Sequence, residues 1–222
     1  SRVLDMKNGT LKRSLIWRSP NGRTLKIDVE RIVPLSHKHL AMIRYEIRPL
    51  GQDLKLQIIS SLDGDVTNLT VENDPRVGSG LQGRALEMET IRTRDGFGLL
   101  RQKTKNSCQT IVSSMENILE TTCSFECKSF NETYSAHTVY DINAKADEPI
   151  LLTKYLAYAT SNDYAVEILE PKTEELLRSA VKEGYESIKS EHIKFLDEFW
   201  KKADIEIKGD PSLQQGIRFN LF

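Results

Sequence analysis

The spacing of apolar residues changes near Pro171, and this change constrains the fold more than any other feature. From Thr10 to about Tyr158, apolar side chains alternate in short runs between turn residues, a spacing typical of β-strands. After Pro171 they recur at steps of three and four, on one side of a helix. These positions are Leu177, Val181, Tyr185, Ile188, His192, Phe195 and Phe199. Strands followed by a helix disfavour a parallel α/β fold.

Turn residues divide the first part of the chain into short strands. Ser19-Pro20-Asn21-Gly22, Asp63-Gly64 and Asp95-Gly96 are turn signals, because Asn-Gly and Asp-Gly readily adopt the positive φ angles of tight turns. A longer loop is expected at residues 72–80. Strands are expected at residues 11–17, 25–29, 40–47, 54–59, 85–94, 97–103, 108–116, 118–125, 133–142 and 150–158. This pattern predicts an antiparallel β-sandwich or barrel.

The helical segment has a start signal and one interruption. Thr173 is suited to cap the helix, and Glu174 and Glu175 suit the positive end of the helix dipole. A continuous helix from here to Trp200 would be about 40 Å long, which favours a linking role. Gly184 indicates either a bend or break in the helix or a close packing contact.

Bulk composition predicts a globular protein without a charged partner. The 222 residues suffice for one domain with an appended helix, and a net charge of -1 gives no reason to expect nucleic acid or an anionic membrane. No apolar run of about 18 residues exists. The three cysteines, Cys108, Cys123 and Cys127, lack zinc-site spacing, so we expect reduced thiols in a cytoplasmic protein. Glycosylation tripeptides at Asn8, Asn68 and Asn131 would matter only in a secreted chain.

No acidic or histidine residues form a recognisable catalytic or metal site. Asp63 and Asp65 flank Gly64 and could form a calcium-binding or acid pair, but they are interpreted as a turn that closes a hairpin. The remaining candidate carboxylates are isolated, form no glycosidase pair and are interpreted as solvated surface or helix-start charges: Glu116, Glu120, Glu174 and Glu175. The histidines His37, His39, His137 and His192 share no ligand spacing. A site at His37 and His39 would lack a third ligand, and we expect His192 to pack between the helix and a neighbouring domain surface.

Aromatic and basic clusters have structural interpretations beside their functional ones. The aromatic residues Trp17, Trp200, Tyr45, Tyr134, Tyr140, Tyr155, Tyr158 and Tyr164 would suit sugar stacking, but most occupy core positions. The basic residues Arg92, Arg94, Arg101, Lys103 and Lys105 would suit phosphate, but they straddle a hairpin turn and favour a solvated sheet edge. Arg218 and Asn220 stand in an apolar segment, so at least one needs a hydrogen-bond partner.

Four strings together resemble a known family. They are residues 4–11 with Arg13 and Trp17 beyond them, residues 39–45, residues 61–68 and residues 199–222. In this order and spacing they resemble the N-terminal region of glycoside hydrolase family 65. That family contains inverting phosphorylases of maltose, trehalose, kojibiose or nigerose, and related hydrolases.

The resemblance implies a larger protein and an architecture. It implies a mainly β domain, a large antiparallel β-sandwich of the galactose-mutarotase-like supersandwich type, at residues 1–165. A long α-helical linker at residues 171–203 and the truncated start of an (α/α)6 barrel at residues 204–222 would follow. It further implies that the first sandwich strands and most of the barrel lie outside this chain.

The same resemblance implies a function for the parent protein. Phosphate would attack the anomeric carbon while a glutamate beyond Phe222 protonates the leaving oxygen, so no catalytic, cofactor-binding or metal-binding residue is assigned here. The expected partners are a disaccharide and phosphate in the missing domain, with a homodimer or a self-associating fragment. Two alternatives remain: a carbohydrate-binding β-sandwich module, and the N-terminal domain of a related hydrolase.

Overall fold

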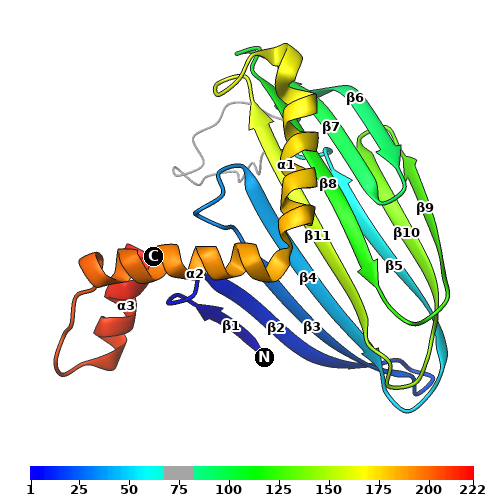
Figure 1. The fold of residues 1–222 in the computed structure, drawn as a ribbon, viewed down its shortest axis with the longest axis horizontal. Coiled ribbons are helices and arrows are strands. Elements are labelled where there is room, and N and C mark those ends of the chain that lie inside the picture. The colour runs from blue at the N-terminus through cyan, green and yellow to red at the C-terminus, as the bar shows by residue number, and fades with distance from the viewer. Residues whose placement is uncertain (68–82) are drawn as a thin grey trace.

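The computed structural model describes residues 1–67 and 83–222. The expected loop at residues 72–80 and the tripeptide at Asn68 lie outside these residues. Strands form two antiparallel sheets, and helices follow them in the chain (Figure 1). The expected mainly β fold, an antiparallel sandwich with helices after the sheets, is confirmed.

The larger sheet contains eight strands in the order β1-β2-β3-β4-β11-β8-β7-β6. Their bounds are β1 Arg2–Asp5, β2 Thr10–Arg18, β3 Thr24–Ile32, β4 Leu40–Pro49, β6 Leu86–Arg94, β7 Phe97–Thr104, β8 Thr110–Glu120 and β11 Ile150–Thr160. The smaller sheet has the order β5-β10-β9, with β5 Leu54–Asp63, β9 Phe125–Asn131 and β10 Ser135–Ala144. It packs on the β6, β7 and β8 part of the larger sheet.

Alternation along β11 shows how the larger sheet is covered on both faces. Leu152 and Leu156 belong to clusters shared with the smaller sheet, whereas Tyr155 and Ala157 belong to the cluster that contains the helices. Each fully buried aliphatic side chain of this kind contributes about 1.5–3 kcal/mol. The larger sheet is therefore a central layer with a sheet on one side and a helix on the other.

Helix α1, Leu169–Glu183, packs against β8 and β11, after a short 3-10 helix at Val166–Ile168. Its buried residues include Leu169, Leu177 and Ala180. Thr173 is fully buried, and its hydroxyl donates to the Glu170 carbonyl oxygen at 3.0 Å. The expected cap at Thr173 is thus wrong, because the helix begins four residues earlier and buries this side chain against the sheet.

Gly184 separates α1 from α2, Tyr185–Ala203. Its φ of 87° and ψ of 154° suit glycine alone, and a Cβ built there meets nothing within 4 Å. Of the two interpretations left open by the sequence, the break is confirmed and the packing contact is wrong. Helix α2 consequently runs in a new direction across β3 and β4 (Figure 1).

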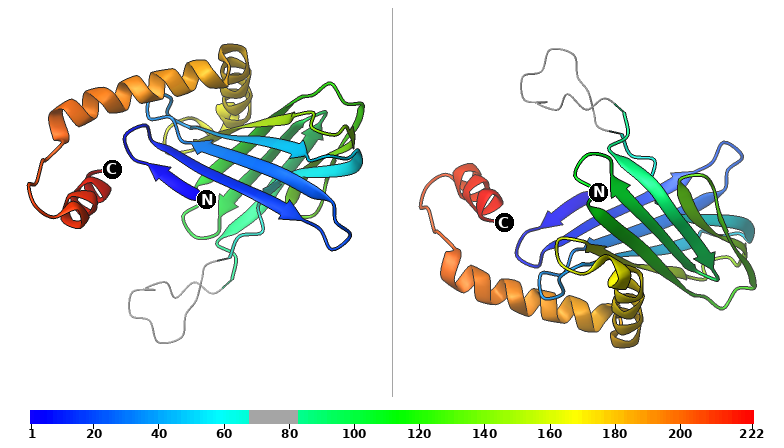
Figure 2. Two further views of the ribbon diagram at one scale, coloured as in Figure 1. Left: turned by 90° about the horizontal axis from the view of Figure 1, so that it is seen from below. Right: turned by 90° about the horizontal axis from the view of Figure 1, so that it is seen from above.

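The last helix, α3, spans Pro211–Leu221 and buries no residue. Asp210 caps it by accepting from the backbone amides of Ser212 and Leu213. Figure 2 shows α3 beside the end of the β1–β2 hairpin. Residues 185–222 are called the arm below.

Several local expectations need correction. The β2–β3 connection runs from residue 19 to 23 and is longer than a two-residue turn, whereas the Asp95-Gly96 turn between β6 and β7 is confirmed. The expected break between residues 116 and 118 does not exist, because β8 continues as one strand to Glu120. Trp17 on β2 is 48% exposed. Phe195 is also 48% exposed, because Leu196 takes the buried position on α2.

Candidate functional site

The seam between the arm and the larger sheet contains hydrogen bonds made by Tyr185, Lys189 and His192 of α2. His192 on α2 is 2% exposed, as expected for a packed histidine. Its Nδ1 accepts from the Leu35 backbone amide at 3.2 Å, so its Nε2 carries the hydrogen directed at the Gly9 carbonyl oxygen, also at 3.2 Å. Burial lowers the pKa of His192, and the bond to Gly9 opposes this. The ring is therefore a neutral connector of two loops.

Glu30 on β3 is the second anchor of the seam. It accepts from the Tyr185 hydroxyl at 2.9 Å and from Lys189 Nζ at 2.6 Å, and Lys12 Nζ lies 3.1 Å away. Burial raises the pKa of Glu30, but these three donors outweigh burial, so the net pKa is lowered. An ionised Glu30 thus fixes the first two turns of α2 on the sheet.

The outer end of the arm contains Arg218, one of the two polar residues singled out in the sequence. Its guanidinium pairs with both oxygens of Asp204 at 2.8 and 2.7 Å, which supplies the expected partner. Asn220 is exposed. The Trp200 indole donates to the Met6 carbonyl oxygen at 3.2 Å. Trp200, Asp204 and Arg218 line a cleft with residues 3–7 of the β1 region.

Acidic residues of α1 neutralise three of the five candidate phosphate-binding basic residues. Arg92 lies 2.8 Å from Glu170 and 2.9 Å from Glu174, and Arg101 lies 3.5 Å from Glu170. Arg94 also contacts Glu174, at 3.5 Å. Glu174 is thus a docking contact of α1 rather than a solvated charge at the helix start.

Asp63 and Asp65 do not close a hairpin, because β5 pairs with β10 in the smaller sheet. The Asp63 carboxylate accepts from the Asp65 amide at 2.8 Å, and Asp65 pairs with Arg84 at 2.6 Å. Both residues line a shallow cleft with His137, whose ring nitrogens each lie 2.7 Å from a serine hydroxyl. This arrangement is a surface hydrogen-bond network.

Two titratable groups are half-buried: Glu116, which the sequence indicated only as an isolated carboxylate, and Lys154, which was not singled out. Burial raises the pKa of Glu116, while nearby Arg94 lowers it and Glu174 raises it. Burial alone lowers the pKa of Lys154 to about 8, and its Nζ donates to the Ser61 carbonyl oxygen at 2.6 Å between the two sheets. Alternation placed Lys154 on the inner face of its strand and was the signal that could have found it.

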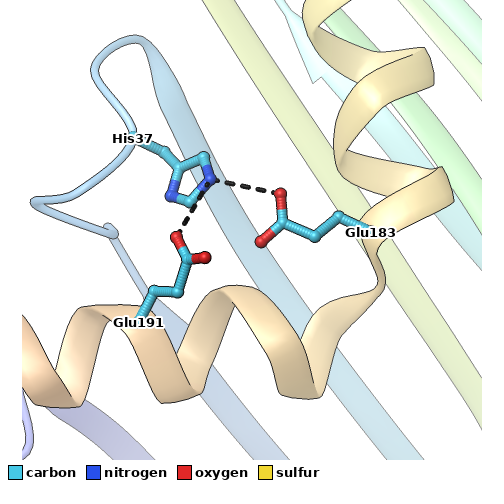
Figure 3. A group of neighbouring side chains, drawn as sticks. All are labelled: His37, Glu183 and Glu191. Carbon is cyan, nitrogen blue, oxygen red and sulfur yellow. Dashed lines mark hydrogen bonds and ion pairs between the residues drawn. The ribbon is translucent and has the colours of Figure 1, made fainter.

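His37 and His39 form no joint site. His39 has a φ of 74° and lies with its ring 5.6 Å from that of Tyr164. His37 instead lies beside Glu183 and Glu191 (Figure 3), and within residues 1–67 and 83–222 these three form the group with metal-ligand spacing. No local sequence signal indicates this group, because His37 is 146 positions from Glu183 and still farther from Glu191.

The described part of the chain is thus an antiparallel β-sandwich domain with a helical arm. A family model described as "Glycosyl hydrolase family 65, N-terminal domain" matches residues 1–199. The chain belongs to glycoside hydrolase family 65, and the resemblance seen in the sequence is confirmed.

Relatives and a solved structure agree with this assignment. The chain is 36% identical over 221 residues to the alpha,alpha-trehalose phosphorylase of Thermoanaerobacter brockii, covering 100% of this chain and 29% of the relative. It is 35% identical over 226 residues to the maltose phosphorylase of Bacillus subtilis, covering 99% and 28%. A putative kojibiose phosphorylase from the human microbiome has the same fold, with a TM-score of 0.82, 21% identity and coverage of 99% and 27%. This chain therefore spans under a third of each.

Within residues 1–67 and 83–222, no helix is both long enough and apolar enough to cross a bilayer.

Proposed function

We propose that this chain is the non-catalytic N-terminal domain of an inverting disaccharide phosphorylase. The observation that carries the proposal is 36% and 35% identity, along essentially the whole chain, to proteins named as trehalose and maltose phosphorylases. The parent would cleave an α-glucosidic disaccharide such as maltose, trehalose or kojibiose into glucose 1-phosphate and glucose. We place this activity in the cytoplasm.

The chemistry needs groups that this domain offers poorly. A phosphate oxygen attacks the anomeric carbon, the glycosidic C–O bond breaks, and a carboxylic acid transfers its proton to the leaving oxygen. The anionic nucleophile needs no second carboxylate as base. In the described residues, two of the candidate acids, Glu174 and Asp65, pair with arginines instead. This pairing supports a structural role for the domain, with disaccharide and phosphate bound elsewhere in the parent.

The seam between the arm and the sheet suits such a role. Glu30 and His192 fix α2, while α3 buries no residue and leaves Phe219 60% exposed. A fixed helix that ends in an exposed apolar segment is suited to contact a further domain. The arm would then orient the catalytic domain relative to the sandwich.

The test uses the longer protein that contains this chain. It is incubated with maltose, trehalose, kojibiose and nigerose, with and without inorganic phosphate, and glucose 1-phosphate is identified by NMR. The proposal predicts phosphate-dependent formation of the β-anomer, because inversion acts on an α-glucosidic bond. Free glucose without a phosphate requirement would support the hydrolase alternative, and no reaction with any sugar would support the carbohydrate-binding module.

A further inference from the structure

A group of potential metal ligands lies at the elbow between α1 and α2. Nε2 of His37 is 3.3 Å from Oε2 of Glu183 and 3.7 Å from Oε2 of Glu191 (Figure 3). All three ligand atoms lie within 4.8 Å of one another. The β3–β4 loop, the end of α1 and the second turn of α2 each contribute one residue, and none of the three takes part in the proposed function.

The backbone and a neighbouring hydroxyl orient the His37 ring. The His37 amide donates to the Pro34 carbonyl oxygen at 3.1 Å, and the Leu40 amide donates to the His37 carbonyl oxygen at 3.3 Å. Nδ1 lies 3.0 Å from the Ser36 hydroxyl. A hydrogen bond at the second ring nitrogen is the usual way in which a metal-binding histidine is oriented. It directs Nε2 toward the two carboxylates.

The charges of the group favour a cation. Glu183 is the last residue of α1, where the partial negative charge of the helix end disfavours a carboxylate. In the described part of the chain, His37 is the ion-pair partner found for both Glu183 and Glu191. A neutral imidazole donates only one hydrogen from Nε2, so it satisfies one carboxylate and leaves the other facing it. A divalent cation between the three atoms would neutralise both.

We propose that His37, Glu183 and Glu191 bind one divalent transition-metal ion of the zinc class, with water as the fourth ligand. Zinc lies about 2.0–2.2 Å from imidazole nitrogen and carboxylate oxygen, so neighbouring ligand atoms in a tetrahedral site are roughly 3.3–3.6 Å apart. The separations of 3.3 and 3.7 Å are close to this spacing. Calcium and magnesium are disfavoured because they select oxygen ligands over imidazole.

The metal would fix the direction of the arm. Gly184 lies between the two glutamates in the sequence and provides the break between the helices. The side chain of Glu191 is 51% exposed, so it has room to rotate and bring its carboxylate closer to the His37 ring. Bound metal would connect both helices to the β3–β4 loop and restrict motion at Gly184. This inference does not depend on the proposed enzymatic function.

The test titrates zinc into this chain after treatment with a chelator, using isothermal titration calorimetry. We expect one zinc per chain. His37→Asn and Glu191→Gln should each weaken binding at least tenfold, because even second-shell changes cost 10–100-fold in metal affinity. Two matched controls should bind as the unchanged chain does: His137→Asn, which removes another histidine with a glutamate 3.8 Å away, and Glu198→Gln, which removes an exposed carboxylate of α2.

A second readout identifies the coordinating atom without any variant. Histidine ¹⁵N NMR of the zinc-loaded chain should show coordination at Nε2 of His37, with Nδ1 protonated. The melting temperature should rise with zinc concentration, since the metal binds the folded state. The proposal is overturned if the chain takes up no zinc, which leaves His37 as an ion-pair partner only. Unchanged affinity in both the His37→Asn and Glu191→Gln variants overturns it equally.

Discussion

His192 of α2 and Gly9 of the β1–β2 turn are in direct contact. Nε2 of His192 lies 3.2 Å from the Gly9 carbonyl oxygen, and a Cβ added at Gly9 would lie 2.2 Å from the same nitrogen. The turn and the helix therefore leave no room for a side chain, and residues 183 positions apart determine each other's placement.

Gly9→Ala should be strongly destabilising. The φ of +61° disfavours a side chain, and the added methyl would also meet Leu196 Cδ1 at 2.5 Å. We expect a loss of about 2–4 kcal/mol in the free energy of unfolding, measured by urea denaturation. Gly22→Ala is the matched control, because Gly22 has a φ of +83° with nothing within 4 Å and should lose only the backbone part. Equal losses in the two variants would contradict the contact.

His192 should make stability depend on pH. Its folded-state pKa lies below the ordinary value of 6.5, mainly because of burial. The unfolded chain therefore takes up a proton first as the pH falls, so stability is full above about pH 6.5 and decreases as the pH drops toward the folded pKa. Protonation at Nδ1 would also remove the bond from Leu35.

The measurement compares the unchanged chain with His192→Gln in urea at a series of pH values from about 8 to 5. The unchanged chain should lose more stability on acidification than the variant, which has no titrating ring at this position. Parallel curves for the two proteins would exclude His192 as the source.

Glu30→Gln should loosen α2 from the sheet. The variant removes the charge that faces Lys189, Lys12 and the Tyr185 hydroxyl, and we expect a loss of about 1–3 kcal/mol at neutral pH. Because the net pKa of Glu30 is lowered, this difference should persist above about pH 4.5 and disappear as the pH falls through the folded pKa. Urea denaturation of both proteins, at neutral pH and at a pH below the folded pKa of Glu30, measures this difference.

Glu46→Gln provides the comparison for Glu30. Glu46 pairs with Arg48 on the same strand, with 44% of its side chain exposed, so its loss should be within about 0.5 kcal/mol. If both variants lose equally little, Glu30 is not an anchor of the arm.

This chain should associate with itself in solution. Phe219 is 60% exposed and Leu213 is 52% exposed on α3, and β1 is an edge strand with Leu4 41% exposed. Sedimentation velocity from low to high micromolar concentration should show a rising weight-average coefficient. Phe219→Ser should reduce the rise more than Ile59→Ser on the smaller sheet. A single monomeric species at all concentrations would refute this expectation.

Local sequence signals predicted the elements whose determinants are local. Asp95-Gly96 specifies the β6–β7 turn, and alternation at residues 40–47 located β4 with both faces covered. The helical spacing correctly predicted a buried His192. It wrongly placed Phe195 on the buried side of α2, where Leu196 lies instead. Propensity and period carry this information within a few residues.

Contacts between distant residues determine the remaining features. Asp63-Gly64 has the composition of a hairpin turn, yet β5 pairs with β10, because burial of Leu62 and Ala136 in one cluster outweighs the local preference. Thr173 has a capping side chain, but α1 buries it. His37 meets Glu183 and Glu191 only after the helices have docked, so no sequence spacing indicated that cluster.

The most direct test of the non-catalytic role compares this 222-residue chain with the longer protein under identical conditions, with maltose or trehalose and inorganic phosphate. We expect the chain alone to be folded by circular dichroism and to form no glucose 1-phosphate, while the longer protein forms it. Phosphate-dependent turnover by the folded chain alone would show that it contains the catalytic groups itself, and would contradict a non-catalytic role.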